Sequence, residues 1–177
     1  MSHEVEIGRG KRGRRAYTLD DIALVPARRT RDPEDVNVGW QIDAYHVDLP
    51  LMAAPMDSVM SPETAIAFGR LGGIGVLDLD GLWTRYEDPE PILDQIAHLG
   101  EEESIATLQR VYSEPIKPTL ITERLTQLRE AGVVVAGKLS PQRVQQHWRA
   151  VVDAGVDLFI IRGSTVSADH VSSPRAP

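Results

Sequence analysis

Four short segments of this chain are apolar at nearly every position, and this continuity constrains the fold more than any other feature. They span about residues 49–54, 74–77, 133–137 and 157–161. A strand with one face in water alternates apolar and polar residues, whereas a continuously apolar strand is buried on both faces. Helical patterns separate the four segments. Buried strands that alternate with helices are typical of a parallel sheet covered by helices.

The expected helices are bounded by residues that suit helix ends. Ser61 and Ser140 each precede a proline, which matches an N-cap followed by the first helical position. Glycines at 72–73, 132 and 155 stand where three of the helices must end, because glycine readily adopts the left-handed conformation of a helix stop. The sequence therefore predicts helices over about residues 62–71, 89–99, 102–113, 119–131 and 141–154.

The number of strand and helix units leaves two α/β architectures open. A closed (β/α)8 TIM barrel needs eight units and roughly 250 residues, with right-handed connections between parallel strands. The 177 residues supply about four units, which corresponds to the N-terminal half of such a barrel. On the pattern alone, a four-unit doubly wound sheet fits the length equally well.

Charge and cysteine content narrow the function classes. A net charge of −7 and a pI near 5.2 argue against a general nucleic-acid partner and against a membrane surface. The longest apolar runs fall far short of the roughly 20 residues that span a bilayer, and no secretory signal pattern is visible at the N-terminus. Without cysteine, the chain has no thiolate nucleophile or disulfide, and a reducing cytoplasm is the default compartment.

The segments at the two ends differ from the rest. Residues 1–16 are basic and glycine-rich and predict a flexible arm, because such a composition cannot bury a core; a phosphate- or subunit-contacting arm is the alternative. Asp20 and Asp21 could form an acid–base pair, but neighbouring aspartates more often bond nearby backbone N–H groups, so we expect a turn cap. Residues 172–177 show no helix or strand pattern and predict a disordered tail.

Three stretches resemble the inosine 5′-monophosphate dehydrogenase and GMP reductase family of (β/α)8 barrels. They are YTLDDIALVP at 17–26, PLMAAPMDSV at 50–59 and LGGIGVL at 71–77. The similarity covers about residues 15 to 170 and is weaker at 131–133 and 154–157. The chain looks most like the bacterial IMP dehydrogenase-related subfamily without CBS regulatory domains. About 55 residues separate the second and third strands, too few to hold a CBS pair.

This resemblance implies an oxidoreductase of purine nucleotide metabolism that acts on IMP or GMP with NAD or NADP. It implies a purine mononucleotide as ligand, no nucleic-acid or membrane partner, and a homo-oligomer, which is a tetramer for the complete family enzyme. In relatives the loop after the first strand contacts the nucleotide, so Met56 is expected against the base or ribose, with core filling as the alternative. Ala54 stands where relatives have a serine that hydrogen-bonds the nucleotide, and alanine cannot donate that bond. Ala54 and Met56 form the predicted nucleotide-binding site. Asp57 is expected to cap the turn.

Two further stretches depart from the family pattern. Residues 78–81 read Asp-Leu-Asp-Gly, where relatives often have a His-Asn-containing segment near the nicotinamide. Arg162, Gly163 and Ser164 stand where relatives have an aspartate for the cofactor ribose. Arginine is a donor only, so Arg162 is expected to bind a cofactor or substrate phosphate or, alternatively, to pair with a carboxylate at the barrel rim. The three residues form the predicted cofactor site.

The family's nucleophile is missing from this chain. The family reaction passes through a covalent thioimidate on a cysteine that follows the sixth strand, and this chain contains no cysteine. We therefore predict no catalytic residue and no metal site within it, and no dehydrogenase or reductase activity from the chain alone. The alternative function is a non-catalytic half-barrel that binds nucleotide or assembles with a partner. Unpaired strand edges predict association in either case.

Overall fold

The computed structural model describes residues 4–26, 29 and 31–163 and divides the chain into two units, Met1–Asn37 and Val38–Pro177. The first unit begins with an antiparallel hairpin of β1 (Glu4–Gly8) and β2 (Lys11–Arg14). The two strands pair because Gly10 adopts a positive φ of 71° and lets the chain turn back; that this segment is a flexible arm stays a prediction. Ser164 and the tail at 172–177 lie outside the described residues.

The aspartate pair of the first unit lies at a turn, as expected. The short 3-10 helices η1 (Leu19–Asp21) and η2 (Pro33–Asp35) follow the hairpin. Asp21 Oδ2 accepts hydrogen bonds from the Thr18 backbone N–H at 2.9 Å and from its hydroxyl at 3.0 Å. These two bonds lower the pKa of Asp21 because they favour the carboxylate. The prediction of a turn cap is confirmed for Asp21.

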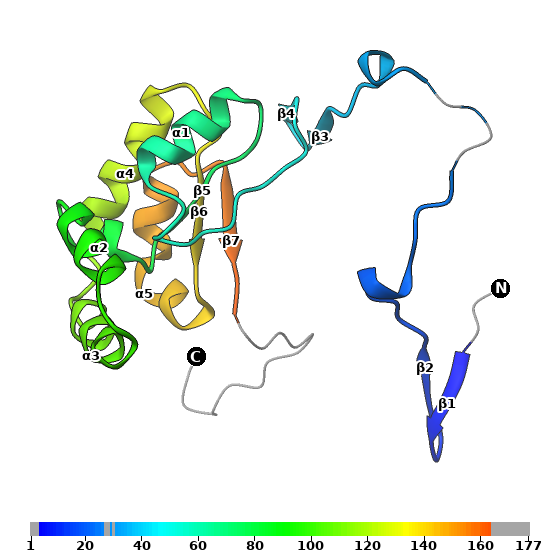
Figure 1. Ribbon diagram of the computed structural model, residues 1–177, viewed down its shortest axis with the longest axis horizontal. Coiled ribbons are helices and arrows are strands. Elements are labelled where there is room, and N and C mark those ends of the chain that lie inside the picture. Colours follow the sequence, from blue (N-terminus) through cyan, green and yellow to red (C-terminus); the bar gives the residue numbers. More distant parts are fainter. Residues whose placement is uncertain (1–3, 27–28, 30, 164–177) are drawn as a thin grey trace. The chain divides into compact units, whose positions relative to one another are not determined.

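The second unit contains a parallel sheet (Figure 1). Strands β5 (Val76–Asp78), β6 (Ala136–Leu139) and β7 (Leu158–Ile161) are all parallel and adjacent in that order. The segment at 49–54, predicted as a full strand, forms one parallel bridge beside β5, from Met52 to Ile74. Pro50 and Pro55 have no backbone N–H to donate, which limits the ladder there. The predicted order and direction are confirmed, and the other three strands begin later than predicted.

The helices lie where the sequence predicts them. They are α1 (Pro62–Arg70), α2 (Glu90–Ala97), α3 (Glu101–Val111), α4 (Pro118–Glu130) and α5 (Pro141–Asp153), with the 3-10 helix η3 (Leu82–Thr84) after β5. Ser61 caps α1, since its hydroxyl accepts from the Thr64 N–H at 3.0 Å. Ser140 precedes α5 without a side-chain cap. Within the described part of the chain, no helix is long and apolar enough to cross a membrane.

Alternate strand residues face two different sides of the sheet. Leu77 and Leu139 face the helices and join a buried cluster with residues of α1, α4 and α5. On the other side, Val76 and Ala136 pack with Val47 from the antiparallel hairpin of β3 (Trp40–Ile42) and β4 (Tyr45–Val47). This second cluster contains no helix residue.

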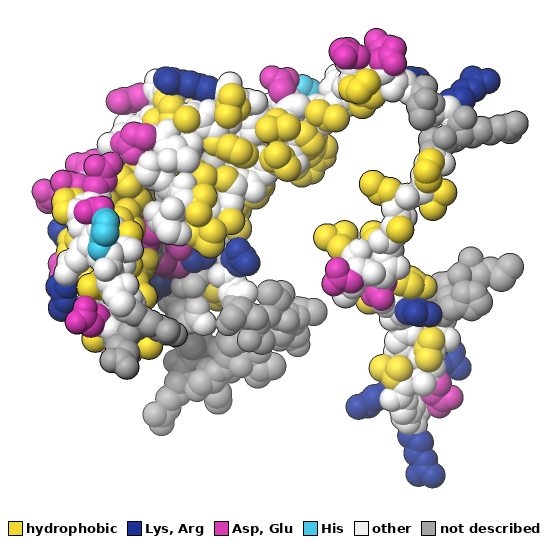
Figure 2. All heavy atoms as spheres, in the orientation of Figure 1, with side chains coloured by type: hydrophobic (Ala, Val, Ile, Leu, Met, Phe, Trp, Pro, Cys, Tyr) yellow, Lys and Arg dark blue, Asp and Glu magenta, His cyan; other side chains and the backbone are white. Residues whose placement is uncertain are grey.

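Among the described residues, the sheet has helices on one side and not on the other, and this distinguishes between the two architectures that the sequence left open. A doubly wound sheet has helices on both faces, whereas a (β/α)8 barrel has them only outside and fills its interior with strand side chains. The second unit therefore has the arrangement of the N-terminal half of a barrel. Its interior side leaves the apolar side chains of Met52 and Met56 about half exposed. Figure 2 shows hydrophobic side chains gathered on the surface of this unit.

Candidate functional site

The carboxyl ends of β5 and β6 bring two aspartates to one lysine. The strand register pairs Asp78 with Lys138. Each lies two residues after an interior-facing residue, Val76 or Ala136, so both side chains face the barrel interior. Lys138 Nζ lies 3.2 Å from Asp78 Oδ1 and 3.1 Å from Asp80 Oδ2. The three side chains are only 15–19% exposed. Asp80 Oδ2 also accepts from the Ser140 backbone N–H at 2.7 Å, which ties the loop after β5 to the start of α5.

Asp57 reaches the same end of the sheet from the loop after the first strand segment. Its Oδ2 accepts from the Leu82 backbone N–H at 2.8 Å and from the Tyr112 hydroxyl at 2.6 Å. The expectation of a local turn cap is therefore wrong: Asp57 joins its loop to η3 and to the residue after α3. Its Oδ1 is buried and has no hydrogen-bond partner among the described residues.

Burial sets the protonation behaviour of this cluster. It raises the pKa of Asp57, against the hydrogen bonds from Tyr112 and Leu82, and it raises the pKa of Asp78, against the Asp80 N–H and Lys138. Burial alone would lower the pKa of Lys138, but Asp78 and Asp80 together raise it above its ordinary value. The pKa of Tyr112 is raised mainly by burial and, second, by its hydrogen bond to Asp57. Lys138 thus stays cationic and Tyr112 stays a hydrogen-bond donor at neutral pH.

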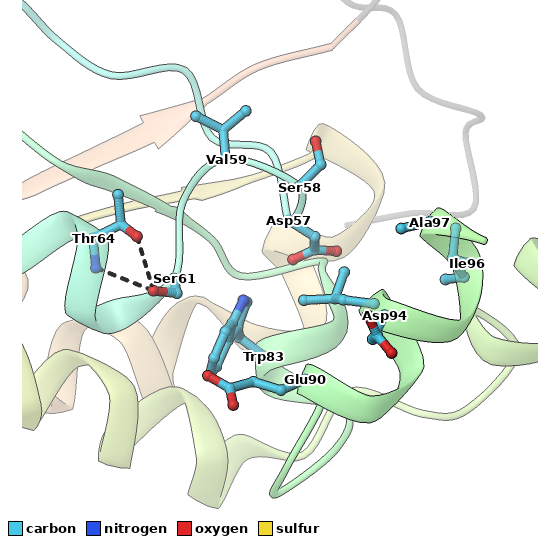
Figure 3. A pocket seen from close by; sticks show the side chains of 11 residues that line it. Asp57, Ser58, Val59, Ser61, Thr64, Trp83, Glu90, Asp94, Ile96 and Ala97 are labelled. Atoms are coloured by element: carbon cyan, nitrogen blue, oxygen red, sulfur yellow. Dashed lines mark hydrogen bonds between the residues drawn. The ribbon is translucent and has the colours of Figure 1, made fainter.

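Two hollows open beside these residues. One, of about 340 Å³, is lined by Met56, Asp57, Asp78 and Tyr112 together with residues of α2, α3 and η3. The other, of about 500 Å³, lies between the 57–61 loop, η3 and α2 (Figure 3). Asp57, Ser58, Leu93 and Ile96 line both hollows. The first hollow is the candidate nucleotide site, because it contains the loop residue singled out from the sequence and the buried carboxylates.

The predicted site residues fall into two groups. Ala54 and Met56 are both exposed; Met56 lines the first hollow, whereas Ala54 is not among its lining residues. Arg162 follows β7, where its N–H donates to the Leu139 carbonyl at 3.1 Å. Its side chain is exposed and forms no ion pair in the described part of the chain. The alternative expectation, that Arg162 pairs with a carboxylate at the barrel rim, is therefore not seen there. Gly163 is partly buried.

Lys138 and Tyr112 are site residues that the sequence did not single out. A lysine inside an otherwise apolar strand, at the same offset as Asp78 in the preceding strand, is a signal that could have found Lys138. Tyr112 lies 55 positions from Asp57, and it follows a helix whose placement over the sheet end depends on the whole fold. Local spacing therefore gave no signal for Tyr112.

Comparison with known proteins agrees with this architecture. The model of the IMP dehydrogenase / GMP reductase domain matches residues 16–173. Proteins named "uncharacterized oxidoreductase" from Mycolicibacterium smegmatis and Mycobacterium tuberculosis are 42% identical over 178 residues, which cover 98% of this chain and 48% of theirs. An inosine-5′-monophosphate dehydrogenase from Methanocaldococcus jannaschii is 41% identical over 64 residues, which are 36% of this chain and 13% of that protein.

A solved structure shows the same likeness in three dimensions. The crystal structure of an IMP dehydrogenase/GMP reductase-like protein from Corynebacterium glutamicum is 42% identical and superimposes with a TM-score of 0.82. The match covers 95% of this chain and 46% of that protein. Nearly all of this chain is matched by these relatives, and it spans about half of their length.

Proposed function

We propose, from the premise that this chain belongs to the IMP dehydrogenase/GMP reductase family, that it supplies the N-terminal half of the active-site mouth of a purine-nucleotide oxidoreductase. The observation that supports this is the hollow at the carboxyl ends of the strands, lined by Met56, Asp57 and Asp78. Barrel enzymes form their sites at this end. The substrate is IMP or GMP, and the cofactor is NAD or NADP.

The charge pattern of the hollow favours the sugar and base of a nucleotide over its phosphate. Lys138 forms ion pairs with Asp78 and Asp80, so it offers no net positive charge to a phosphate. Asp57 and Asp78 both line the hollow, and Asp57 Oδ1 is buried with no hydrogen-bond partner among the described residues. Carboxylate oxygens accept hydrogen bonds and suit ribose hydroxyls. These groups therefore fit the ribose-bearing part of a substrate or cofactor, while Met56 offers an apolar contact to the base.

The remaining contacts come from other positions. Arg162 forms no ion pair within the described part of the chain, and it continues the interior-facing positions of the sheet, since it lies two residues beyond Ile160, which pairs with Lys138. With Gly163 and Ser164, Arg162 is proposed to hold a phosphate of the cofactor, whose nicotinamide carries the hydride. The chain has no cysteine, so the nucleophile of a thioimidate route would come from the other half of the barrel.

Complementation between halves tests this function. The chain is co-expressed with the C-terminal half of the Mycolicibacterium smegmatis relative, and turnover of IMP with NAD or NADP and of GMP with NADPH is followed at 340 nm, the absorbance of the reduced cofactor. We expect no turnover from either half alone and measurable turnover from the pair. Asp78→Asn in the pair should lower it, while Glu123→Gln on the exposed face of α4 serves as the matched control.

The second candidate function is a half-barrel that assembles without catalysis. The exposed apolar interior side and the open edge at Ile161 favour it. A complex between the halves that forms at full yield but neither binds IMP or GMP by calorimetry nor turns them over would contradict the oxidoreductase proposal and support this alternative.

A further inference from the structure

The larger hollow adjoins the proposed nucleotide site and shares Asp57, Ser58, Leu93 and Ile96 with it. Its volume of about 500 Å³ lies within the usual range for small-molecule sites, about 300–1,000 Å³. Its walls come from the 57–61 loop, the start of α1, η3 and α2 (Figure 3), and neither Met56 nor Asp78 lines it. Val59, Leu93, Ile96 and Ala97 make much of its surface apolar.

One wall of this pocket carries a buried donor that has no partner. Trp83 is only 6% exposed, and its Nε1 is buried without a hydrogen-bond partner among the described residues. Figure 3 shows the indole nitrogen directed towards the space between Ser61 and Asp57. An indole Nε1–H can only donate, and leaving a buried donor unpaired is unfavourable. A ligand atom that accepts this bond would remove that penalty.

Arg124 holds the indole ring in this orientation. Its guanidinium lies 5.5 Å from the centroid of the Trp83 ring, and its Nε donates to the Trp83 carbonyl oxygen at 3.1 Å. Arg124 Nη2 also donates to the Glu87 carbonyl at 2.6 Å. Because backbone and ring are fixed together, the Nε1–H is held in place before any ligand arrives, which reduces the entropic cost of binding.

The charges of the lining define the class of ligand. Asp57, Glu90 and Asp94 are the charged residues of the lining, and no lysine or arginine is among them. Asp57 Oδ1 adds a buried acceptor without a partner among the described residues. The pocket therefore disfavours anions and suits a molecule that accepts from Trp83 and donates to Asp57.

We propose that this pocket binds a flat, uncharged heteroaromatic molecule, of which a nucleoside without phosphate is the representative. An acceptor atom of the ring meets Trp83 Nε1–H, a donor meets Asp57 Oδ1, and the apolar side chains of α2 cover the ring. The proposal does not depend on the proposed oxidoreductase function. Because Asp57 and Ser58 line both hollows, an occupied pocket fixes the loop that carries Met56.

Indole resonances of the 15N-labelled chain test the proposal with adenosine as the probe. The chain has three tryptophans, Trp40, Trp83 and Trp148, so each ring N–H can be followed separately. We expect adenosine to shift the Trp83 signal and leave those of Trp40 and Trp148 in place. Adenosine monophosphate, which carries the same base and an added anion, should bind several-fold more weakly because of the three carboxylates.

Two variants separate pocket binding from general effects on folding. Trp83→Phe keeps an aromatic ring but removes the donor, and should weaken adenosine about three- to tenfold, the equivalent of one hydrogen bond. Ala97→Phe fills the pocket and should abolish binding, whereas Ala106→Phe on the exposed side of α3 should not. Equal shifts at all three tryptophans, or unchanged affinity in both Trp83→Phe and Ala97→Phe, would overturn the proposal.

Discussion

The two ends of the parallel sheet each carry buried carboxylates, but only one end satisfies them. At the amino end, Asp157 Oδ1 accepts from the Tyr45 hydroxyl at 2.7 Å and Oδ2 accepts from the Val135 N–H at 2.8 Å. At the carboxyl end, Asp57 and Asp80 each retain a buried oxygen without a partner among the described residues. Natural proteins satisfy nearly all buried polar groups, so these two carboxylate oxygens are groups to which a ligand can contribute a hydrogen bond.

The packing around these carboxylates differs in the same way. Asp157 joins three elements, since Tyr45 belongs to β4, Val135 precedes β6 and Asp157 precedes β7. Val47 of the same hairpin closes the interior side below Ile74 and Val76. At the carboxyl end, two hollows are open where the amino end is closed by Val47. The same residue type thus stabilises the fold at one end and is left available for binding at the other, as barrel enzymes in general divide these roles.

Removing the lysine from the carboxyl end should have the largest effect. Lys138→Met leaves Asp78 and Asp80 close together without a cation. Breaking a fully buried pair costs about 3–5 kcal/mol, and because these side chains keep 15–19% exposure we expect about 2–3 kcal/mol less unfolding free energy at pH 7. Urea denaturation measures it. Lys138→Arg, which keeps the charge, should lose less than half as much.

The pH dependence of this variant has a defined sign. Burial already raises the pKa of Asp78 in the folded protein, and loss of the Lys138 charge raises it further. A carboxyl group with a raised folded pKa binds its proton more readily in the folded state, so it costs stability as pH rises above its unfolded pKa. The deficit of Lys138→Met should therefore be largest near neutral pH and shrink towards about pH 4. A deficit that grows on acidification would contradict this assignment.

The amino end should respond to a change at Asp157 in stability alone. Asp157→Ala leaves the Tyr45 hydroxyl and the Val135 N–H without their acceptor, and we expect a loss of about 2 kcal/mol. Asp157→Asn keeps one acceptor oxygen and should lose about half of that. The readout is the urea midpoint of each variant, followed by IMP affinity under native conditions. Weaker IMP binding by folded Asp157→Ala would show that the two ends are not independent.

A tyrosine pair sharpens the comparison on a smaller scale. Tyr112→Phe removes the 2.6 Å bond to Asp57 Oδ2, which should cost about 1 kcal/mol and raise the pKa of Asp57 further, because that bond favours the carboxylate. Tyr86→Phe is the matched control, since the Tyr86 hydroxyl donates to the Val111 carbonyl at 3.1 Å rather than to a carboxylate. Carbonyl-carbon NMR titration of Asp57 should show the upward pKa shift in the first variant only.

The sequence predicted the elements of this fold better than the contacts between them. Apolar runs located β5, β6 and β7, and glycines located helix ends, because both depend on neighbouring residues. The loop at Met56 was identified through a family motif. Asp57 was assigned to a local turn, yet it bonds Tyr112 and Leu82, 55 and 25 positions away. Such partners are brought together by packing of the whole unit, which local patterns do not encode.

The two Ser-Pro helix starts give the smallest expected effect and separate local from tertiary causes most directly. Ser61 and Ser140 have the same sequence context, but only the Ser61 hydroxyl caps its helix. Ser61→Ala should therefore cost about 1 kcal/mol. Ser140→Ala should cost almost nothing, because its contact to Asp80 is made by the backbone N–H, which alanine retains. Thermal unfolding of the two variants side by side measures the difference. Equal losses would mean that the Ser140 hydroxyl caps α5 as the Ser61 hydroxyl caps α1.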